Sequence, residues 1–220
     1  MKNSADKVKT EEDLKLDQAL YERLCETQRL ISKKVVVSEE YCEGVEKVAG
    51  VDASYCGDSA LVGFTVFSIP ENRILLVSVS TTRSKMPYFS SLLCFREGPV
   101  VLPILRRFLT EYDVLLVNGH GLAHPRKCGL ATFLGVLLKK PTIGVARKPL
   151  GRLDEEHNVN HLRAFGDRFY YSVGNMMTLE GAFNVLRRTT LRDRGLPIPL
   201  EAAHFFSRKA LTLVAGDETV

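Results

Sequence analysis

The sequence has few features of membrane-spanning or secreted proteins. Among its 220 residues, no apolar run approaches the roughly 18 residues that a membrane-spanning helix needs. The first residues lead into charged ones rather than into an apolar segment, so we expect no secretory signal. The five cysteines include no CxxC pair, and their odd number fits no disulfide framework. We therefore expect no membrane partner, and reduced thiols in the cytoplasm or, in a eukaryote, the nucleus.

The chain also lacks internal repeats and low-complexity tracts, and its composition is that of a globular protein. Hydrophobic residues make up 45% and charged residues 25%, which excludes a mostly disordered chain. The length favours one domain, so we expect a flexible N-terminus over residues 1–12 and a single, monomeric domain over 13–220. The net charge of +4 permits a nucleic-acid partner without requiring one.

Hydrophobic periodicity predicts an α/β fold. Three apolar runs with short turns between them, at residues 48–55, 61–68 and 74–80, predict an antiparallel meander. Short apolar runs at 114–117 and 142–146, joined by a helical segment, are typical of parallel strands. A further strand is expected at 169–173, a loop at 147–168, and helices at 11–31, 97–111, 127–138, 178–188 and 200–213. The first five strands predict a mixed five-stranded central sheet, antiparallel meander plus parallel strands, with helices on both faces.

Two of the predicted helices carry further detail. The first is predicted to be amphipathic, because apolar residues recur near helical spacing. These residues are Leu16, Leu20, Leu24 and Ile31. The second contains Pro103, and a proline in mid-helix costs about 3 kcal/mol. We therefore expect this helix to start close to Pro99 or to kink.

Polar side chains from separate segments could meet at one end of such a sheet. Asp52 lies in a small apolar strand, Glu97 begins a predicted helix, Asn118 ends a buried strand and His204 lies on the last helix. Carboxylates that converge from a strand and a helix can bind Mg²⁺, which acts as a Lewis acid in phosphodiester hydrolysis. Histidine can carry a proton.

Each of these residues alone also has an ordinary explanation. Asp52 could face water at a sheet edge, Glu97 could stabilise a helix N-terminus, and His204 could pack or cap a helix. The segment NGHGLAHPR, residues 118–126, has two glycines and two histidines, a density that loop composition does not explain. Its glycines allow a close approach of backbone to a ligand, or simply a tight turn from strand to helix.

Several motifs together resemble the endonuclease V family. They are VAGVD at 48–52, PY at 87–88, LCFREGP at 93–99, NGHGLAHPR at 118–126 and IGVA at 143–146. The resemblance runs from about residue 16 to residue 210. It implies a ribonuclease H-like fold and an endonuclease that depends on Mg²⁺, with Mn²⁺ able to substitute. Such enzymes cut the second phosphodiester bond 3′ to inosine in DNA or RNA.

The resemblance assigns catalytic and metal-binding roles. Asp52, Glu97 and position 118 match metal ligands, and His204 matches a C-terminal residue that supports the metal site. His124 matches a histidine close to the scissile phosphate.

The resemblance also assigns substrate contacts. Tyr88, which follows Pro87, matches the aromatic residue of a wedge that separates the strands. The loop that helps form the pocket for a flipped base is matched by Gly119, His120 and Gly121. We expect Arg126 and Arg147, which flank the site, to contact phosphate.

The sequence departs from the family pattern at several positions. Asn118 stands where the family has Asp, and an amide oxygen can bind Mg²⁺ but adds no negative charge. Arg147 replaces the usual Lys, the wedge segment 87–91 lacks a proline and a glycine of the family, and Asn175 replaces a usual His. Asp113 is the nearest acidic alternative to Asn118, but it lies at the wrong end of the strand.

Asn118 leaves alternatives open. The chain is an active or weakened nuclease, or a homologue that binds inosine without efficient cleavage, or a variant with Asn introduced to trap a substrate complex. A protein-interaction scaffold on this fold would show neither inosine preference nor salt-sensitive nucleic-acid binding. DNA and RNA are equally open as substrates.

Overall fold

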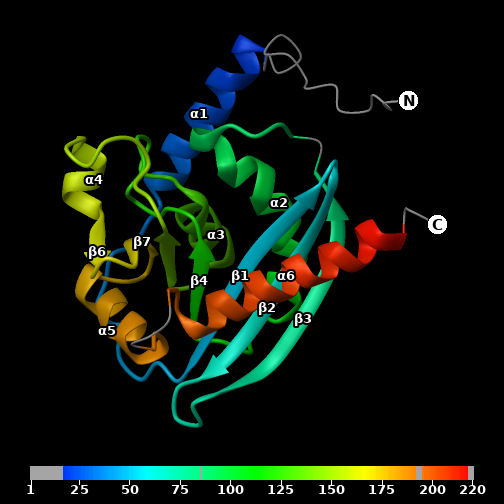
Figure 1. Ribbon diagram of the computed structural model, residues 1–220. Coiled ribbons are helices and arrows are strands. Elements are labelled where there is room, and N and C mark those ends of the chain that lie inside the picture. The colour runs from blue at the N-terminus through cyan, green and yellow to red at the C-terminus, as the bar shows by residue number, and fades with distance from the viewer. Residues whose placement is uncertain (1–16, 85, 192–194, 218–220) are drawn as a thin grey trace, which may run out of the picture.

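A seven-stranded mixed sheet forms the centre of the computed structural model, which describes residues 17–84, 86–191 and 195–217. The strands are β1 (Lys47–Cys56), β2 (Ser59–Ser68), β3 (Arg73–Arg83), β4 (Val114–Asn118), β5 (Thr142–Ala146), β6 (Arg163–Phe165) and β7 (Phe169–Asn175). Their order across the sheet is β3-β2-β1-β4-β5-β7-β6 (Figure 1). β1, β4 and β5 are parallel, and the other neighbours are antiparallel. The predicted mixed sheet with its meander is confirmed.

The helices cover both faces of the sheet, as predicted. They are α1 (Gln18–Ser32), α2 (Leu93–Arg107), α3 (Leu130–Leu138), α4 (Glu156–His161), α5 (Leu179–Thr189) and α6 (Ile198–Asp217), with a 3₁₀ turn at Ser90–Leu92. Alternate strand residues point to opposite faces. Ala49 and Val51 of β1 therefore pack in the cluster that includes α2 and α3, whereas Val48 packs in the cluster that includes α5 and Leu200 of α6.

Several predicted details were wrong. The sheet has seven strands rather than five, because the strand expected at 169–173 joins it beyond β5 as β7, and the short β6, which was not expected, pairs at the edge. Both β6 and α4 fall in the predicted loop 147–168, where a three-residue strand leaves no hydrophobic period to detect. In α1, Leu20 is 45% exposed, and the buried residues are Cys25 and Gln28. The predicted flexible segment 1–12 and Leu16 lie outside the described residues.

The helix α2 begins at Leu93, four residues before the predicted start. Glu97 therefore lies in the second turn, so its favourable interaction with the helix N-terminus is weaker than we predicted. The helix contains both Pro99 and Pro103. Both prolines are exposed, so the carbonyl groups that they leave without a helical donor lie on the solvent side.

Two glycines allow α6 to lie directly on the sheet. Figure 1 shows α6 crossing β1 and β2. A Cβ atom at Gly50 would overlap the carbonyl of Pro199, and one at Gly63 would overlap the carbonyl of Ala203. Since Gly63 pairs with Asp52 across the two strands, the close crossing brings α6 next to Asp52.

No helix within the described residues is both long and apolar enough to cross a membrane.

Candidate active site at the ends of strands β1 and β4

The parallel pairing of β1 and β4 brings Asp52 next to Asn118. Val51 pairs with Val117, so the residues that follow them are neighbours on the same face of the sheet. Asn118 Nδ2 donates a hydrogen bond of 2.8 Å to Asp52 Oδ1. Because a carboxylate only accepts, this bond leaves Asn118 Oδ1 available as an oxygen ligand or acceptor.

The helix α6 supplies two more donors to the same carboxylate. His204 Nδ1 lies 2.8 Å from Asp52 Oδ2, and Ser207 Oγ donates to that oxygen at 3.3 Å. His204 therefore carries a proton on Nδ1, and its side chain is 40% exposed. These three donors compensate the Asp52 carboxylate for its loss of water. Asp52 is buried, so the alternative that it faces water at a sheet edge is wrong.

Glu97 reaches the site from α2, on the other side of β1. Burial, and the negative charge of Asp52, raise the pKa of the Glu97 carboxyl to about 8, although Arg96 opposes the shift. A second negative charge beside Asp52 is therefore unfavourable without a cation to balance it. Asp52 thus bonds Asn118 and His204 directly, and Glu97 lies near enough for the Asp52 charge to act on its pKa.

The donor set of this site fits a hard cation. Two carboxylates and one amide oxygen are the oxygen ligands that Mg²⁺ prefers, and a cation would offset the burial and the Asp52 charge that raise the pKa of Glu97. Within the part of the chain that the structure describes, no three His, Cys, Asp or Glu side chains cluster in positions that could hold a metal. Asp52, Glu97 and His204 are three residues of these types, so their side chains would have to move closer together to bind one ion. Asn118 adds no negative charge to the two carboxylates.

His124 lies apart from the carboxylates and is buried. Its Nδ1 accepts from the backbone N–H of Arg126 at 3.1 Å, so Nε2 carries the proton, 3.0 Å from Ser91 O. Burial, followed by the charge of Arg126, lowers the pKa of His124 to about 3. His124 is therefore neutral at physiological pH, and both ring nitrogens are engaged within the protein.

The glycine-rich loop after β4 lies tightly against neighbouring backbone. A Cβ atom at Gly121 would overlap the carbonyl of Val173, and the Gly121 N–H donates to Ser172 Oγ at 2.8 Å. Gly119 has a φ of +157°, and His120 Nε2 lies 3.1 Å from Lys148 O. Burial lowers the pKa of His120. Glycine at position 121 is thus required by close packing.

The remaining predicted site residues differ in how accessible their side chains are to a ligand. Arg126 Nε donates to Gln28 Oε1 at 2.6 Å and its Nη2 donates to Ser91 O at 2.7 Å, so two of its donors act within the protein. Tyr88 is 64% exposed and follows the half-buried Pro87. Arg147 is exposed directly after β5.

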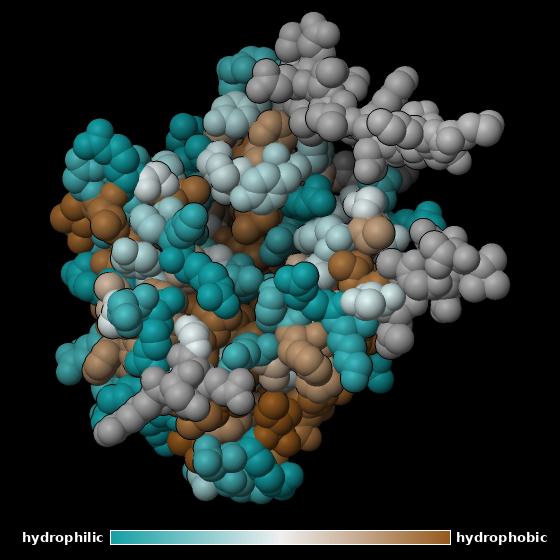
Figure 2. All heavy atoms as spheres, viewed as in Figure 1, coloured by the Kyte–Doolittle hydropathy of each residue, from teal (hydrophilic) through white to brown (hydrophobic). Residues whose placement is uncertain are grey.

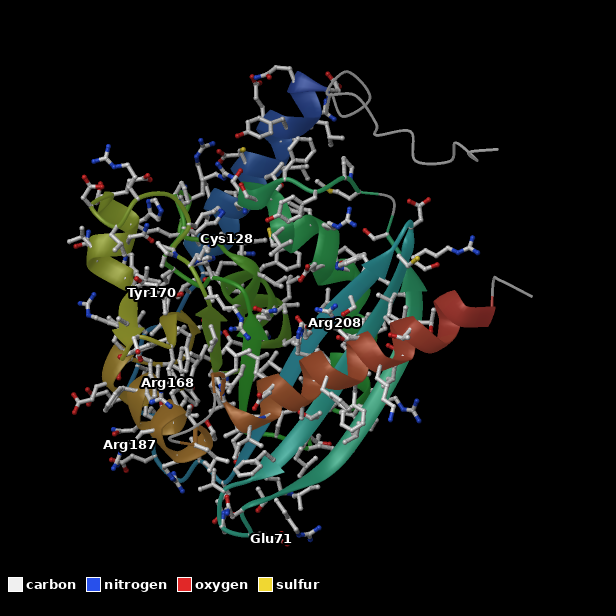
Figure 3. The ribbon with its side chains drawn as sticks, viewed as in Figure 1. Glu71, Cys128, Arg168, Tyr170, Arg187 and Arg208 are labelled. Carbon is white, nitrogen blue, oxygen red and sulfur yellow. The ribbon has the colours of Figure 1, made fainter. Side chains whose placement is uncertain are left out.

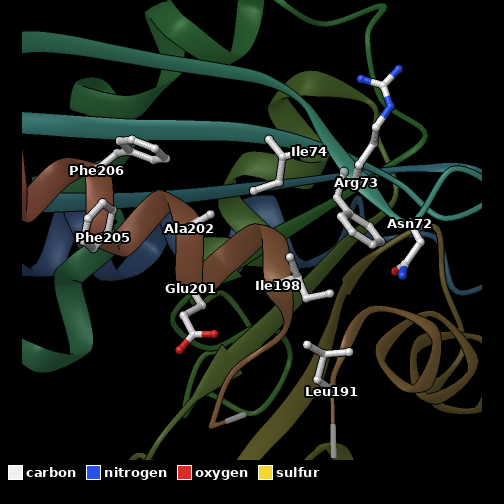
Figure 4. A pocket seen from close by; sticks show the side chains of 10 residues that line it. Asn72, Arg73, Ile74, Leu191, Ile198, Glu201, Ala202, Phe205 and Phe206 are labelled. Atoms are coloured by element: carbon white, nitrogen blue, oxygen red, sulfur yellow. The ribbon is translucent and has the colours of Figure 1, made fainter. Parts of the chain in front are cut away.

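Two cavities differ in position and size. A cavity of about 20 Å³ beside the loop has room for little more than a water molecule. It is lined by Gln28, Ser90, Leu93, Cys94, His120, His124, Gly129, Leu130 and Leu150. A larger cavity of about 490 Å³ lies between α6, Leu191 and the β2–β3 connection (Figure 4), and its lining does not include His204. Apolar residues gather at the surface where α6 crosses β2 and β3 (Figure 2).

The sequence did not indicate three residues that hold the site residues or the neighbouring segments in place. Ser207 bonds Asp52, and its position three residues after His204, on the same helix face, could have indicated it. Arg96 lies over the Tyr55 ring at 4.3 Å and donates to Met86 O, so it links α2 to β1 and to the residue before segment 87–91. Gln28 carried no sequence signal at all.

Comparison with known proteins identifies what the chain is similar to. The sequence model of the endonuclease V family matches residues 29–165. Endonuclease V of Pyrococcus abyssi is 40% identical over 189 residues, covering 86% of this chain and 92% of that protein. The crystal structure of the catalytic domain of human endonuclease V has a TM-score of 0.79 and 26% identity, covering 91% of this chain and 99% of the other.

A third similar structure is the D234N variant of Ciona intestinalis endonuclease V, in complex with a DNA containing an inosine followed by a ribo-adenosine. Its TM-score is 0.80 at 23% identity, and the match covers 90% of this chain and all of that one. At this identity the likeness supports the fold.

Proposed function

The chain belongs to the endonuclease V family, whose members are nucleases, and we propose that it is a divalent-metal-dependent endonuclease that cuts DNA or RNA beside inosine. The observation that carries the proposal is that Asp52 forms hydrogen bonds with Asn118 and His204. Glu97 is close enough for the Asp52 charge to raise its pKa. Inosine as the target is supported by the inosine-containing DNA bound to the Ciona relative.

Asp52, Glu97 and the amide oxygen of Asn118 would hold the metal, which we propose to be Mg²⁺, with Mn²⁺ able to replace it. When bound, the ion supplies a Lewis acid for the phosphate and lowers the pKa of water. His204 supports Asp52 through Nδ1–H, and its partly exposed ring leaves Nε2 to exchange a proton near the leaving group.

Other residues would bind and orient the nucleic acid. Tyr88 is exposed enough to stack between bases, as a wedge that separates the strands requires. Arg147 would contact a phosphate from the end of β5. The backbone of Gly119–Gly121 would face a flipped base, and cleavage would fall at the second phosphodiester 3′ to the inosine. The small cavity admits a base only after its lining segments move apart.

The test uses matched DNA and RNA strands, each with inosine or with adenine at one position. Wild type is expected to cut the inosine strands with Mg²⁺ and to lose this activity in a chelator. Asp52→Ala and Glu97→Ala should abolish cleavage while retaining binding. Cleavage that persists in both variants would refute the site, and equal cleavage of adenine strands would refute the specificity.

One observation favours a second candidate function, an inosine-binding protein that cleaves poorly. Asn118 supplies a hydrogen-bond donor, where a carboxylate would add charge for the cation. This candidate predicts tight, inosine-selective binding by wild type with cleavage near the background rate at saturating Mg²⁺. The same strands, assayed for binding and for cleavage, separate the two functions.

A further inference from the structure

Helix α1 is attached to the rest of the protein through a buried amide. The buried side chains of α1 are Cys25 and Gln28, and Gln28 is 0% exposed. Glutamine is seldom buried, because its amide loses water and must find partners within the protein. The position of Gln28 therefore requires an explanation beyond packing.

The partners of Gln28 come from two segments that flank the proposed nucleic-acid site. Its Nε2 donates to Cys128 O at 2.8 Å and to Ser91 O at 3.1 Å, and lies 3.3 Å from Cys94 Sγ. Its Oε1 accepts from Arg126 Nε at 2.6 Å. A guanidinium cannot accept and a carbonyl cannot donate, so these partners fix the orientation of the amide. Figure 3 shows Cys128 near the end of α1.

The carbonyl of Ser91 is where these contacts converge. It lies 3.1 Å from Gln28 Nε2, 3.0 Å from His124 Nε2 and 2.7 Å from Arg126 Nη2. A carbonyl oxygen has two lone pairs, so three donors around it require that each donor be held in place. Gln28 holds Arg126 and also bonds Ser91 directly.

We propose that Gln28 is a positioning residue that fixes segment 87–91, which carries Tyr88, against the loop of His124 and Arg126, and so sets the discrimination for inosine. The inference rests on the proposed function, because discrimination has meaning only for an inosine-binding protein. Gln28, Ser90 and His124 also line the small cavity beside the loop, so the position of this segment controls its width. Neither Gln28 nor Cys128 touches the reacting atoms.

The test compares Gln28→Met, which keeps the length of the side chain, with Asn175→Leu as a matched control. Asn175 is also a buried amide that anchors the N-terminal part of the chain. It accepts from Val36 N at 3.0 Å and donates to Gly135 O at 3.0 Å. Three quantities are measured: the unfolding midpoint in urea, amide hydrogen exchange of residues 87–92 without ligand, and the ratio of Kd values for adenine and inosine strands.

Gln28→Met is expected to speed exchange in residues 87–92 and to lower the Kd ratio, each by about tenfold, the effect of one hydrogen bond to a charged group. Asn175→Leu should lower the urea midpoint by a similar amount but leave the exchange of residues 87–92 and the Kd ratio unchanged. If Gln28→Met does not fold, Gln28→Glu keeps an acceptor for Arg126 and lacks the donor to Ser91. Exchange should again be faster and the Kd ratio lower, each by about fivefold, the effect of one neutral hydrogen bond.

Wild-type discrimination in the Gln28 variant would overturn the inference, as would equal effects in the Asn175 control. Absence of inosine preference in wild type would instead refute the proposed function. Hydrogen exchange, which needs no substrate, then still reports whether Gln28 holds the segment.

Discussion

The substitution Asn118→Asp changes the charge of the proposed metal site by one unit at a known distance. Asn118 Nδ2 now donates to Asp52 Oδ1 at 2.8 Å. A carboxylate at position 118 would remove that donor and place a like charge beside Asp52. We expect the variant to be less stable than wild type without metal, and more active with it.

The size of both effects follows from the contact. Losing a hydrogen bond to a charged group costs about 1.5–3 kcal/mol, and repulsion between the carboxylates adds to this unless they share a proton. Without metal, the free energy of unfolding should fall by about 2–4 kcal/mol. Mg²⁺ at about 100 times its Kd should raise the free energy of unfolding of the variant by about 2.7 kcal/mol. Cleavage at saturating Mg²⁺ should rise at least about tenfold, since a further anionic ligand strengthens binding of the cation.

The assay combines urea unfolding in chelator and in Mg²⁺ with single-turnover cleavage of an inosine strand. Asn118→Ala is the control, because it removes the hydrogen bond without adding charge. It should lose stability without gaining a response to Mg²⁺. Equal, slow cleavage by wild type and both variants would refute a metal-binding role for position 118.

Three further predictions follow from the same geometry. The raised pKa of Glu97, about 8, means that the metal-free folded state binds more protons than the unfolded state above about pH 4.5. Stability should therefore fall by roughly 4 kcal/mol as pH rises from 4.5 through 8, and urea unfolding of Glu97→Gln in chelator should lack this fall. Gly63→Ala should push α6 from the sheet and lower the free energy of unfolding by about 2 kcal/mol, measured as a lower urea midpoint. An unchanged midpoint would refute the close crossing. Inosine-strand binding should weaken steeply with salt, and Arg147→Ala should reduce the slope of log K against log salt by about one; an unchanged slope would place Arg147 away from phosphate.

The central sheet was predictable because it rests on local patterns, whereas the roles of Asp52, Glu97 and His204 came from the resemblance of their motifs to endonuclease V. Short apolar runs marked β4 and β5, and strand ends in an α/β sheet lie together. Asp52 and Asn118 were therefore expected to meet, and the register of β1 and β4 explains why they do.

Other features depend on contacts that no local pattern records. The burial of Gln28 in α1 depends on partners 63 and 100 residues away, Ser91 and Cys128. Likewise, the sequence placed His124 at the scissile phosphate through resemblance, but could not indicate that both of its nitrogens are bonded internally. Side-chain orientation of this kind follows only from the packed structure.

The claim that Asp52 and Glu97 together bind one divalent cation is tested most directly by calorimetric Mn²⁺ titration of the nucleic-acid-free protein. Wild type, Asp52→Asn, Glu97→Gln and the double variant form a thermodynamic cycle. We predict that each single variant loses most of the affinity and that the double variant loses little more, because either change destroys the same site. Affinity equal to wild type in either single variant, or fully additive losses, would contradict the account.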